Sequence, residues 1–204
     1  MSPEPELRLH EEILLLTLKD EKGTPAWTQY TYALAGAILA ELVMEERVRL
    51  EERNRRKPLV DLVSATQIGD PILDDALRKV RLARRRATAG TWIQRWARNR
   101  LLHETARRLV LRGILRAREK RVLLLFSRTV YPELNPGPEQ RLIERMREAI
   151  FGNDDVDART ATVISLAGAA DLLKPVFGKD LKGRKDRLAA LAEGEAVSEV
   201  TRAT

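Results

Sequence analysis

A chain of 204 residues, with 44% hydrophobic and 33% charged side chains, has the length and the composition of one substantial folded domain. It contains no cysteine, which excludes a disulfide framework, a thiolate metal site and a cysteine nucleophile, and its formal net charge of +7 favours an acidic partner. Aromatic residues make up only 4%, so the core must consist mainly of Leu, Ile, Val and Ala, a mixture that favours helices.

The first quarter of the chain predicts two helices. Residues 1–6 are rich in Pro and Glu and lack a signal-peptide pattern, so we expect a flexible N-terminus. Leu7 to Leu18 includes four consecutive apolar residues and predicts a short helix, with a buried strand as the alternative. Pro25, after a Thr that suits the N-cap, begins a helix that runs to about Glu46 and is apolar on nearly all sides. Such a helix is expected at the centre of a bundle.

Two short strands and a capped helix are predicted next. Arg47 to Leu50 favours a strand, and Leu59 to Val63 favours a strand or a turn of helix. Asp70 followed by Pro71 is typical of an N-cap and the first residue of a helix. The apolar residues of this third helix share one face: Ile72, Leu73, Ala76, Leu77 and Val80.

A long helix and a hairpin follow. The helix is expected from about Thr91 to Arg112, and Gly113 ends it. Two mainly apolar segments, Ile114 to Ala117 and Arg121 to Phe126, then flank Arg118-Glu119-Lys120. This pattern predicts a β-hairpin with the three charged residues at its turn.

The last third of the chain completes a helical protein. Helices are predicted for Arg141 to Phe151 and Ala158 to Leu173, with a weak one around Arg187 to Leu191. The predicted fold is therefore all-α: a single helical-bundle domain over residues 7–192 with a protruding β-hairpin, followed by a flexible C-terminal tail, 193–204.

Basic residues are concentrated in one region. Residues 76–128 contain 17 lysines and arginines and only two acidic residues, whereas acidic residues predominate elsewhere. This segregation indicates a polyanionic partner, either a lipid surface or a nucleic acid, with a solvated helical face as the alternative. The longest apolar stretch, about Tyr30 to Ala40, is roughly half of the ~20 residues that a membrane helix needs, so the chain is expected to touch a membrane without crossing it.

Catalytic patterns are weak. His10 and His103 are the only histidines, and there is no nucleophile elbow and no phosphate-binding glycine loop. Asp70 is explained as a cap, and Glu11 and Glu12 are neighbours that cannot converge on one site. We expect a protein that is not an enzyme and that has no metal site and no cofactor.

Tryptophans and arginines in two places suggest an anion-binding surface. Trp92 and Trp96 are four residues apart on one helical face, interspersed with arginines, although Trp92 is better explained as a core anchor. Trp27 lies in the first turn of a helix, where backbone N–H groups can bind an anion, or where the ring can cover the bundle. The predicted headgroup-binding residues are Trp27, Arg95, Arg98 and Arg100.

The hairpin allows two functions. Leu123, Leu124 and Leu125 are consecutive, so both faces of a strand there would be apolar, and one face would need a partner chain or a bilayer. The expected oligomer- or membrane-contacting residues are Arg118, Lys120, Arg121 and these three leucines. A helix followed by a basic hairpin is also typical of a winged-helix DNA-binding domain, which is the alternative function.

Several collinear stretches from about Leu7 to Phe177 resemble the Golgi phosphoprotein 3 family. They are residues 9–16 (LHEEILLL) with 18–20, 36–42 (GAILAEL), Thr66 with 69–77 (GDPILDDAL), 92–93, 109–110 with 113–115, 123–126, 140–143 and 158–159. The chain looks like a short, bacterial-type member that lacks the family's last apolar helix.

The resemblance implies a mainly helical fold that binds phosphatidylinositol 4-phosphate on the cytosolic face of a membrane, as a peripheral protein of the cytoplasm. It also implies a hairpin for self-association and membrane contact, and an adaptor function through the cytosolic tails of membrane proteins. Nucleic acid is not a partner in this interpretation. Trp27 matches the tryptophan of the family's headgroup pocket, but the three basic positions fall on Ala35, Asn99 and Leu102. Arg98 and Arg100, on either side of Asn99, would then supply the charge.

Overall fold

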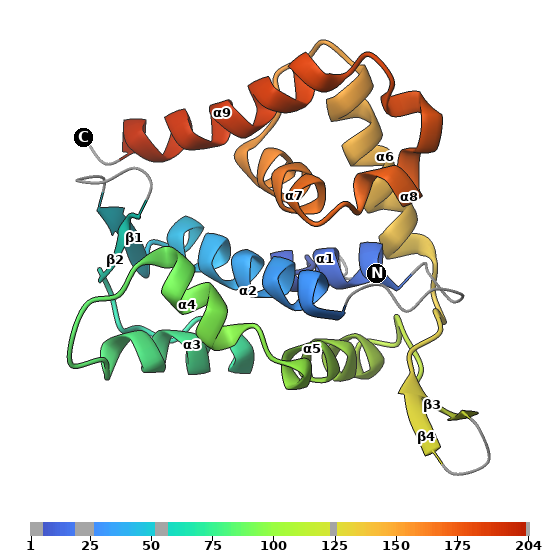
Figure 1. Cartoon of the computed structure of the whole chain (residues 1–204), viewed down its shortest axis with the longest axis horizontal. Coiled ribbons are helices and arrows are strands. Elements are labelled where there is room, and N and C mark those ends of the chain that lie inside the picture. Colours follow the sequence, from blue (N-terminus) through green and yellow to red (C-terminus); the bar gives the residue numbers. More distant parts are fainter. Residues whose placement is uncertain (1–5, 19–26, 52–56, 123–125, 203–204) are drawn as a thin grey trace, which may run out of the picture.

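The computed structural model of the chain describes residues 6–18, 27–51, 57–122 and 126–202, with the backbone alone at 27–29, 120–122, 126–128 and 194–202. This part of the chain is mostly helical and contains two small antiparallel sheets (Figure 1). The elements are α1 (Leu9–Thr17), α2 (Trp27–Met44), β1 (Val48–Glu51), β2 (Leu59–Leu62), α3 (Pro71–Arg81), α4 (Ala89–Trp96), α5 (Asn99–Leu111), β3 (Arg118–Val122), β4 (Phe126–Val130), α6 (Gly137–Phe151), α7 (Ala158–Ala169), α8 (Leu173–Phe177), the 3₁₀ helix η2 (Gly178–Leu181) and α9 (Lys185–Arg202).

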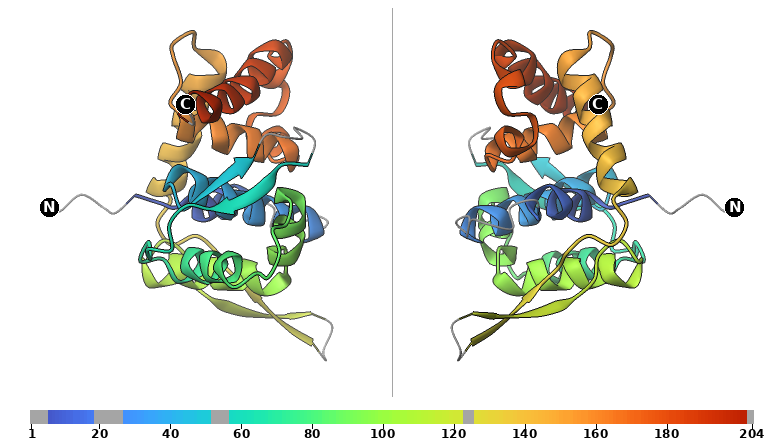
Figure 2. Two further views of the ribbon diagram at one scale, coloured as in Figure 1. Left: turned by 90° about the vertical axis from the view of Figure 1, so that its left-hand side faces the viewer. Right: turned by 90° about the vertical axis from the view of Figure 1, so that its right-hand side faces the viewer.

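The helix α2 lies in the centre of the molecule. Its side chains Leu34, Ala35, Ile38 and Leu42 are buried, and it packs against α1, α3, α4, α5 and α7. Figures 1 and 2 show α1 and α2 as a middle layer between α3–α5 on one side and α6–α9 on the other. The prediction of a central apolar helix is confirmed. The segment that the sequence allowed as a short helix or a buried strand is a helix, α1.

The prediction of a single hairpin was wrong, because β1 and β2 form a second one, with Val48 opposite Leu62. The predicted turn of the other hairpin was also wrong. Arg118-Glu119-Lys120 lies in strand β3, where Arg118 is opposite Val130. Arg118 and Glu119 are exposed, so no buried face restricts this strand to apolar residues. Ile114 and Leu115 are instead buried at the base of the hairpin.

The predicted long helix from Thr91 to Arg112 is two helices, α4 and α5, separated by Ala97 and Arg98. Arg98 has an extended backbone, with φ −127° and ψ 149°. At about 100° per residue, a continuous helix would place Leu101 on the side opposite Trp92 and Trp96. The break allows the two tryptophans and the apolar face of α5 to be buried together.

The last helices differ from their predicted bounds. The helix α7 ends at Ala169, earlier than the predicted Leu173, because the chain turns at Asp171, whose φ is +56°. The helix α9 is longer than the short helix that the sequence indicated, and it packs on α7. The domain boundaries remain predictions.

Candidate functional site

The predicted headgroup-binding arginines gather around the junction of α4 and α5. Arg95 is in the last turn of α4, Arg98 is the N-cap residue of α5, and Arg100 is in the first turn of α5. All three side chains are exposed. Trp27 is the first residue of α2, but its side chain is outside the described part of the structure, so its place relative to the arginines stays a prediction.

Each of these arginines has one side-chain contact within the described residues. The guanidinium carbon of Arg95 lies 4.9 Å from the ring centroid of Trp92. Nε of Arg98 donates to the carbonyl oxygen of Arg95 at 3.1 Å, and Nε of Arg100 donates to Glu104 at 2.7 Å. Because a guanidinium has five N–H donors, each side chain keeps donors for an anion. We call Arg95, Arg98 and Arg100 the α4–α5 surface.

The start of α5 adds backbone donors to this surface. Arg98 provides no side-chain acceptor at the N-cap position, so the first N–H groups of this 13-residue helix have no side-chain cap. Uncapped N–H groups and the helix dipole both favour a bound anion at such an end. The α4–α5 surface therefore combines three guanidinium groups with a helix N-terminus.

Two of the positions that are basic in the family lie inside the core here. Ala35 is buried within α2, and Leu102 is buried within α5. A charged side chain at either position would lose its hydration without a partner. Asn99 is exposed at the start of α5, between Arg98 and Arg100. The basic residues nearest to Asn99 in the sequence are the exposed Arg98 and Arg100.

Trp92 and Trp96 are core residues. Both are buried, and their ring centroids are 5.3 Å apart in a stacked arrangement. The interpretation of Trp92 as a core anchor is confirmed. Neither ring is exposed to reach a membrane, so the indoles contribute to the α4–α5 surface only by supporting Arg95.

The predicted hairpin contacts are described only in part. Arg118 is exposed. Lys120 and Arg121 are described by their backbone alone, and Leu123, Leu124 and Leu125 lie outside the described residues. At the base of the hairpin, Leu111 is 88% exposed and Leu134 is 58% exposed, and neither was predicted. The exposure of Leu111 could not be predicted from the sequence, because the other apolar residues of α5 follow the helical periodicity.

A network of buried ion pairs joins the helices, and sequence reasoning missed it. Glu11 lies 2.7 Å from Arg112, and Glu12 lies 2.7 Å from Arg145, so the two acids point to different helices. Asp70 accepts from the N–H groups of Ile72 and Leu73, as a cap should, and also pairs with Arg108 at 2.9 Å. Its interpretation as a cap alone was incomplete.

Glu41 connects three helices in the same network. It accepts from the N–H of Leu9 at 2.6 Å, and both Arg8 and Arg159 lie 3.2 Å from it. The acids and the arginines of this network neutralise one another, although some of their buried atoms, such as Oε2 of Glu12 and Nε of Arg159, have no hydrogen-bond partner among the described residues. Arg108 of α5 and Arg112, the residue that follows α5, are both paired with acids of this network.

Burial changes the pKa of two residues in this network. Burial lowers the pKa of His10 to about 4. The nearby carboxylate of Asp70 opposes this effect, and the positive charge of Arg108 adds to it. Burial likewise raises the pKa of Glu12, although Arg145 lowers it. His10 is fully buried, and neither ring nitrogen has a hydrogen-bond partner. The protonation of His10 and Glu12 therefore affects the stability of the fold, and neither buried side chain is accessible to a substrate.

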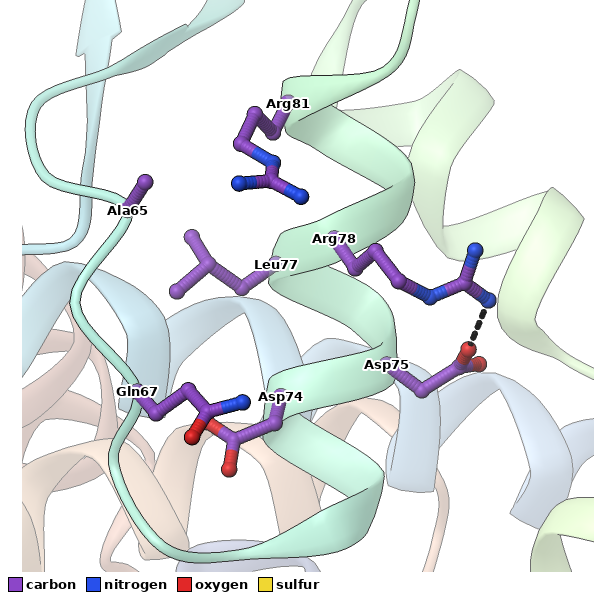
Figure 3. A pocket seen from close by; sticks show the side chains of 7 residues that line it. All are labelled: Ala65, Gln67, Asp74, Asp75, Leu77, Arg78 and Arg81. Atoms are coloured by element: carbon purple, nitrogen blue, oxygen red, sulfur yellow. Dashed lines mark hydrogen bonds and ion pairs between the residues drawn. The ribbon is translucent and has the colours of Figure 1, made fainter.

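A pocket of about 300 Å³ lies between α3 and the segment before it (Figure 3). Gln67 and Asp74 lie at one end, Arg81 lies at the other, and the apolar middle contains Leu77 and Ala65. The remaining lining residues, Asp75 and Arg78, pair with each other at 2.5 Å. Two carboxylates balance two guanidiniums, so this pocket is not a strong anion site.

Within the described ranges, no single helix has the length and apolarity to cross a membrane, although α7 with the segment Leu173–Leu181 meets both criteria as a pair bent by 101°. The same ranges contain no group of three or more His, Cys, Asp or Glu side chains placed to hold a metal ion.

The chain is similar to a known family and to a curated protein of that family. Residues 9–204 match the family model described as Golgi phosphoprotein 3. The chain is also 30% identical, over 213 aligned positions, to vacuolar protein sorting-associated protein 74 of Schizosaccharomyces pombe. That alignment covers 93% of this chain but 57% of the relative, so the chain spans somewhat more than half of the relative's length.

Proposed function

Because the chain belongs to the Golgi phosphoprotein 3 family, we propose that it is a peripheral membrane protein that binds anionic phospholipid headgroups through its α4–α5 surface. The observation that carries the proposal is the set of exposed guanidiniums of Arg95, Arg98 and Arg100 beside the uncapped start of α5. Phosphate groups accept charge-assisted hydrogen bonds from arginine and from helix N-termini.

Most arginines near the end of α5 are paired with acids, which favours the α4–α5 surface as the lipid-binding site. Arg108 and Arg112 are committed to Asp70 and Glu11, whereas Arg107 is exposed on the same helix. Each cation near an anionic bilayer contributes roughly 1 kcal/mol of attraction. Several cations together are therefore sufficient for reversible binding without a deep pocket.

The preferred lipid by resemblance is phosphatidylinositol 4-phosphate. With Ala35 and Leu102 in the core, the headgroup is held by the flexible arginines beside Asn99 and, as proposed from the sequence, by Trp27. Long exposed arginines form a less rigid site than a buried pocket. We therefore propose preference for phosphorylated headgroups with modest selectivity among them.

The remaining parts of the proposal follow from the family. We propose an adaptor function on the cytosolic face of a membrane, with cytosolic tails of membrane proteins as partners, self-association through the β3–β4 hairpin, and no catalytic activity. The hairpin projects from the helical layers in Figures 1 and 2, where another chain or a bilayer can reach it.

Liposome flotation beside a duplex-DNA shift assay at matched salt tests this function. Vesicles of phosphatidylcholine with phosphatidylinositol 4-phosphate should carry the chain upward, and phosphatidylcholine alone should not. DNA binding with a steep salt dependence and no flotation would favour the winged-helix alternative instead.

A further inference from the structure

Three arginines at the end of α3 have no ion-pair partner in the part of the chain that the structure describes. Arg81, Arg84 and Arg85 are exposed, and residues 81–88 include no acid. The neighbouring Arg86 differs, because Nη1 lies 2.7 Å from Glu51 and 2.9 Å from Asp61. Arg86 therefore fixes this segment to the β1–β2 hairpin, and the other three cations remain available.

Exposed apolar side chains lie among these cations. Leu82 is 62% exposed, and Val63 is 54% exposed. The two segments run antiparallel, since Leu59 is bridged to Thr88 and the N–H of Val60 donates to Ala87 at 3.0 Å. The ion pair between Arg86 and Asp61 continues this side-by-side course to the end of β2, which Val63 follows directly.

The close-up view extends the same surface across α3. In Figure 3 the side chain of Arg81 is directed toward Ala65, two residues after Val63. Val63 and Ala65 are both exposed. We call Val63, Arg81, Leu82, Arg84 and Arg85 the α3-end surface.

The α3-end surface is separate from the α4–α5 surface. The helix α4 lies between them, and its eight residues span about 12 Å. Figure 1 shows the segment between α3 and α4 at the opposite end of the molecule's long axis from the β3–β4 hairpin. The basic region of the sequence, residues 76–128, is thus divided between distant parts of the fold.

We propose that the α3-end surface is a second membrane contact, in which Arg81, Arg84 and Arg85 meet lipid phosphates and Leu82 enters the apolar edge of an anionic bilayer. This inference rests on the proposed function, because it assigns the same partner to a new surface. Nucleic acids and acidic peptides complement the arginines, but neither provides an apolar layer for Leu82. An anionic bilayer provides both, with phosphates outside and hydrocarbon beneath.

The absence of cysteine in the sequence allows a direct test. An environment-sensitive dye is attached to Leu82→Cys, to Leu134→Cys at the hairpin base, and to Lys182→Cys as a control. Flotation of the same samples with phosphatidylcholine–phosphatidylserine vesicles establishes binding. The dye at position 82 should shift to the blue on anionic vesicles, and the dye at position 182 should not.

A charge variant tests the arginines. Arg81→Gln, Arg84→Gln and Arg85→Gln combined should lower vesicle affinity at least about tenfold, since each cation at an anionic surface contributes roughly fivefold. The matched control is Lys174→Gln, Lys179→Gln and Lys182→Gln, which removes the same charge from exposed residues of another face. Its loss should be about twofold or less, and urea unfolding verifies that both variants are folded.

The outcomes separate this inference from the proposed function. Flotation with an unshifted dye at position 82, or equal losses in the two charge variants, would overturn the α3-end contact and leave the proposed function standing. A dye shift with duplex DNA or polyglutamate but not with vesicles would also overturn it. Failure of the unmodified chain to float with these vesicles and also with vesicles that contain phosphatidylinositol 4-phosphate would refute the proposed function, and this inference with it.

Discussion

The carboxylate of Asp70, which caps α3, lies 2.9 Å from the guanidinium of Arg108 in α5. One side chain therefore starts a helix and ties it to another. Asp70 is buried, whereas Arg108 is partly exposed at the edge of the same cluster. This contact joins the start of α3 to α5, whose other end carries part of the α4–α5 surface.

The two roles of Asp70 can be measured separately. Asp70→Asn keeps a good N-cap but removes the charge, and should lower the free energy of unfolding by roughly 2 kcal/mol. Asp70→Ala should cost about 1 kcal/mol more, because the cap is lost as well. Urea denaturation gives both values. The control, Asp75→Ala, removes exposed pairs with Arg78 and Lys79 and should cost under about 1 kcal/mol. Equal effects of Asn and Ala at position 70 would show that the cap contributes nothing.

Acid should destabilise the protein through His10. Its folded-state pKa of about 4 lies below the ordinary 6.5, so the unfolded chain takes up this proton first as the pH falls. The free energy of unfolding should therefore decrease by about 2 kcal/mol between pH 7 and pH 5 on account of this residue. The raised pKa of Glu12 acts in the opposite direction, so the comparison is with His10→Gln. Identical pH profiles of the two proteins would contradict the assignment.

Removing Glu104 should strengthen headgroup binding. Glu104 holds Arg100 at 2.7 Å, and its charge opposes an incoming phosphate. Glu104→Gln should raise the affinity for a soluble inositol phosphate by roughly two- to fivefold, measured by calorimetry. Glu144→Gln on α6 makes the same change of net charge away from this surface and should have little effect. A comparable gain from both variants would mean that net charge alone matters.

The β3–β4 hairpin should be removable without unfolding the protein. Its base is closed by the bridge between Leu115 and Glu133 and by the N–H of Arg116, which donates to Pro132 at 3.0 Å. Replacing residues 118–130 with two glycines should change the free energy of unfolding by less than about 1 kcal/mol. Self-association or vesicle binding should be lost, as sedimentation and flotation would show. If both persist, the hairpin has neither role.

Local signals in the sequence predicted the helices well. The start of α3 at Asp70 and Pro71 depends only on neighbouring residues, so it can be predicted from the sequence alone. The break at Arg98 was not, because each half of the predicted long helix is helical on its own and only the change of buried face separates them. The charged segment of β3 was assigned to a turn because an exposed hairpin needs no apolar alternation.

The candidate site was predicted less completely, for a physical reason. Whether an arginine is free depends on acids distant in the sequence. Arg112 is engaged by Glu11 across 101 residues, whereas the Arg98 side chain has only a local contact, with Arg95, among the described residues. Charge density located the basic region but could not divide it into committed and available cations. The burial of Leu102 likewise depends on packing against other helices.

The affinity of three proteins for phosphatidylcholine vesicles containing phosphatidylinositol 4-phosphate tests the central claim most directly. They are the unmodified chain, the combined variant Arg95→Gln, Arg98→Gln and Arg100→Gln, and the lysine control Lys174→Gln, Lys179→Gln and Lys182→Gln. We predict at least about a tenfold loss for the arginine variant and about twofold or less for the control. Equal losses in the two variants, or equal binding of the unmodified chain to vesicles of phosphatidylcholine alone, would contradict headgroup binding at the α4–α5 surface.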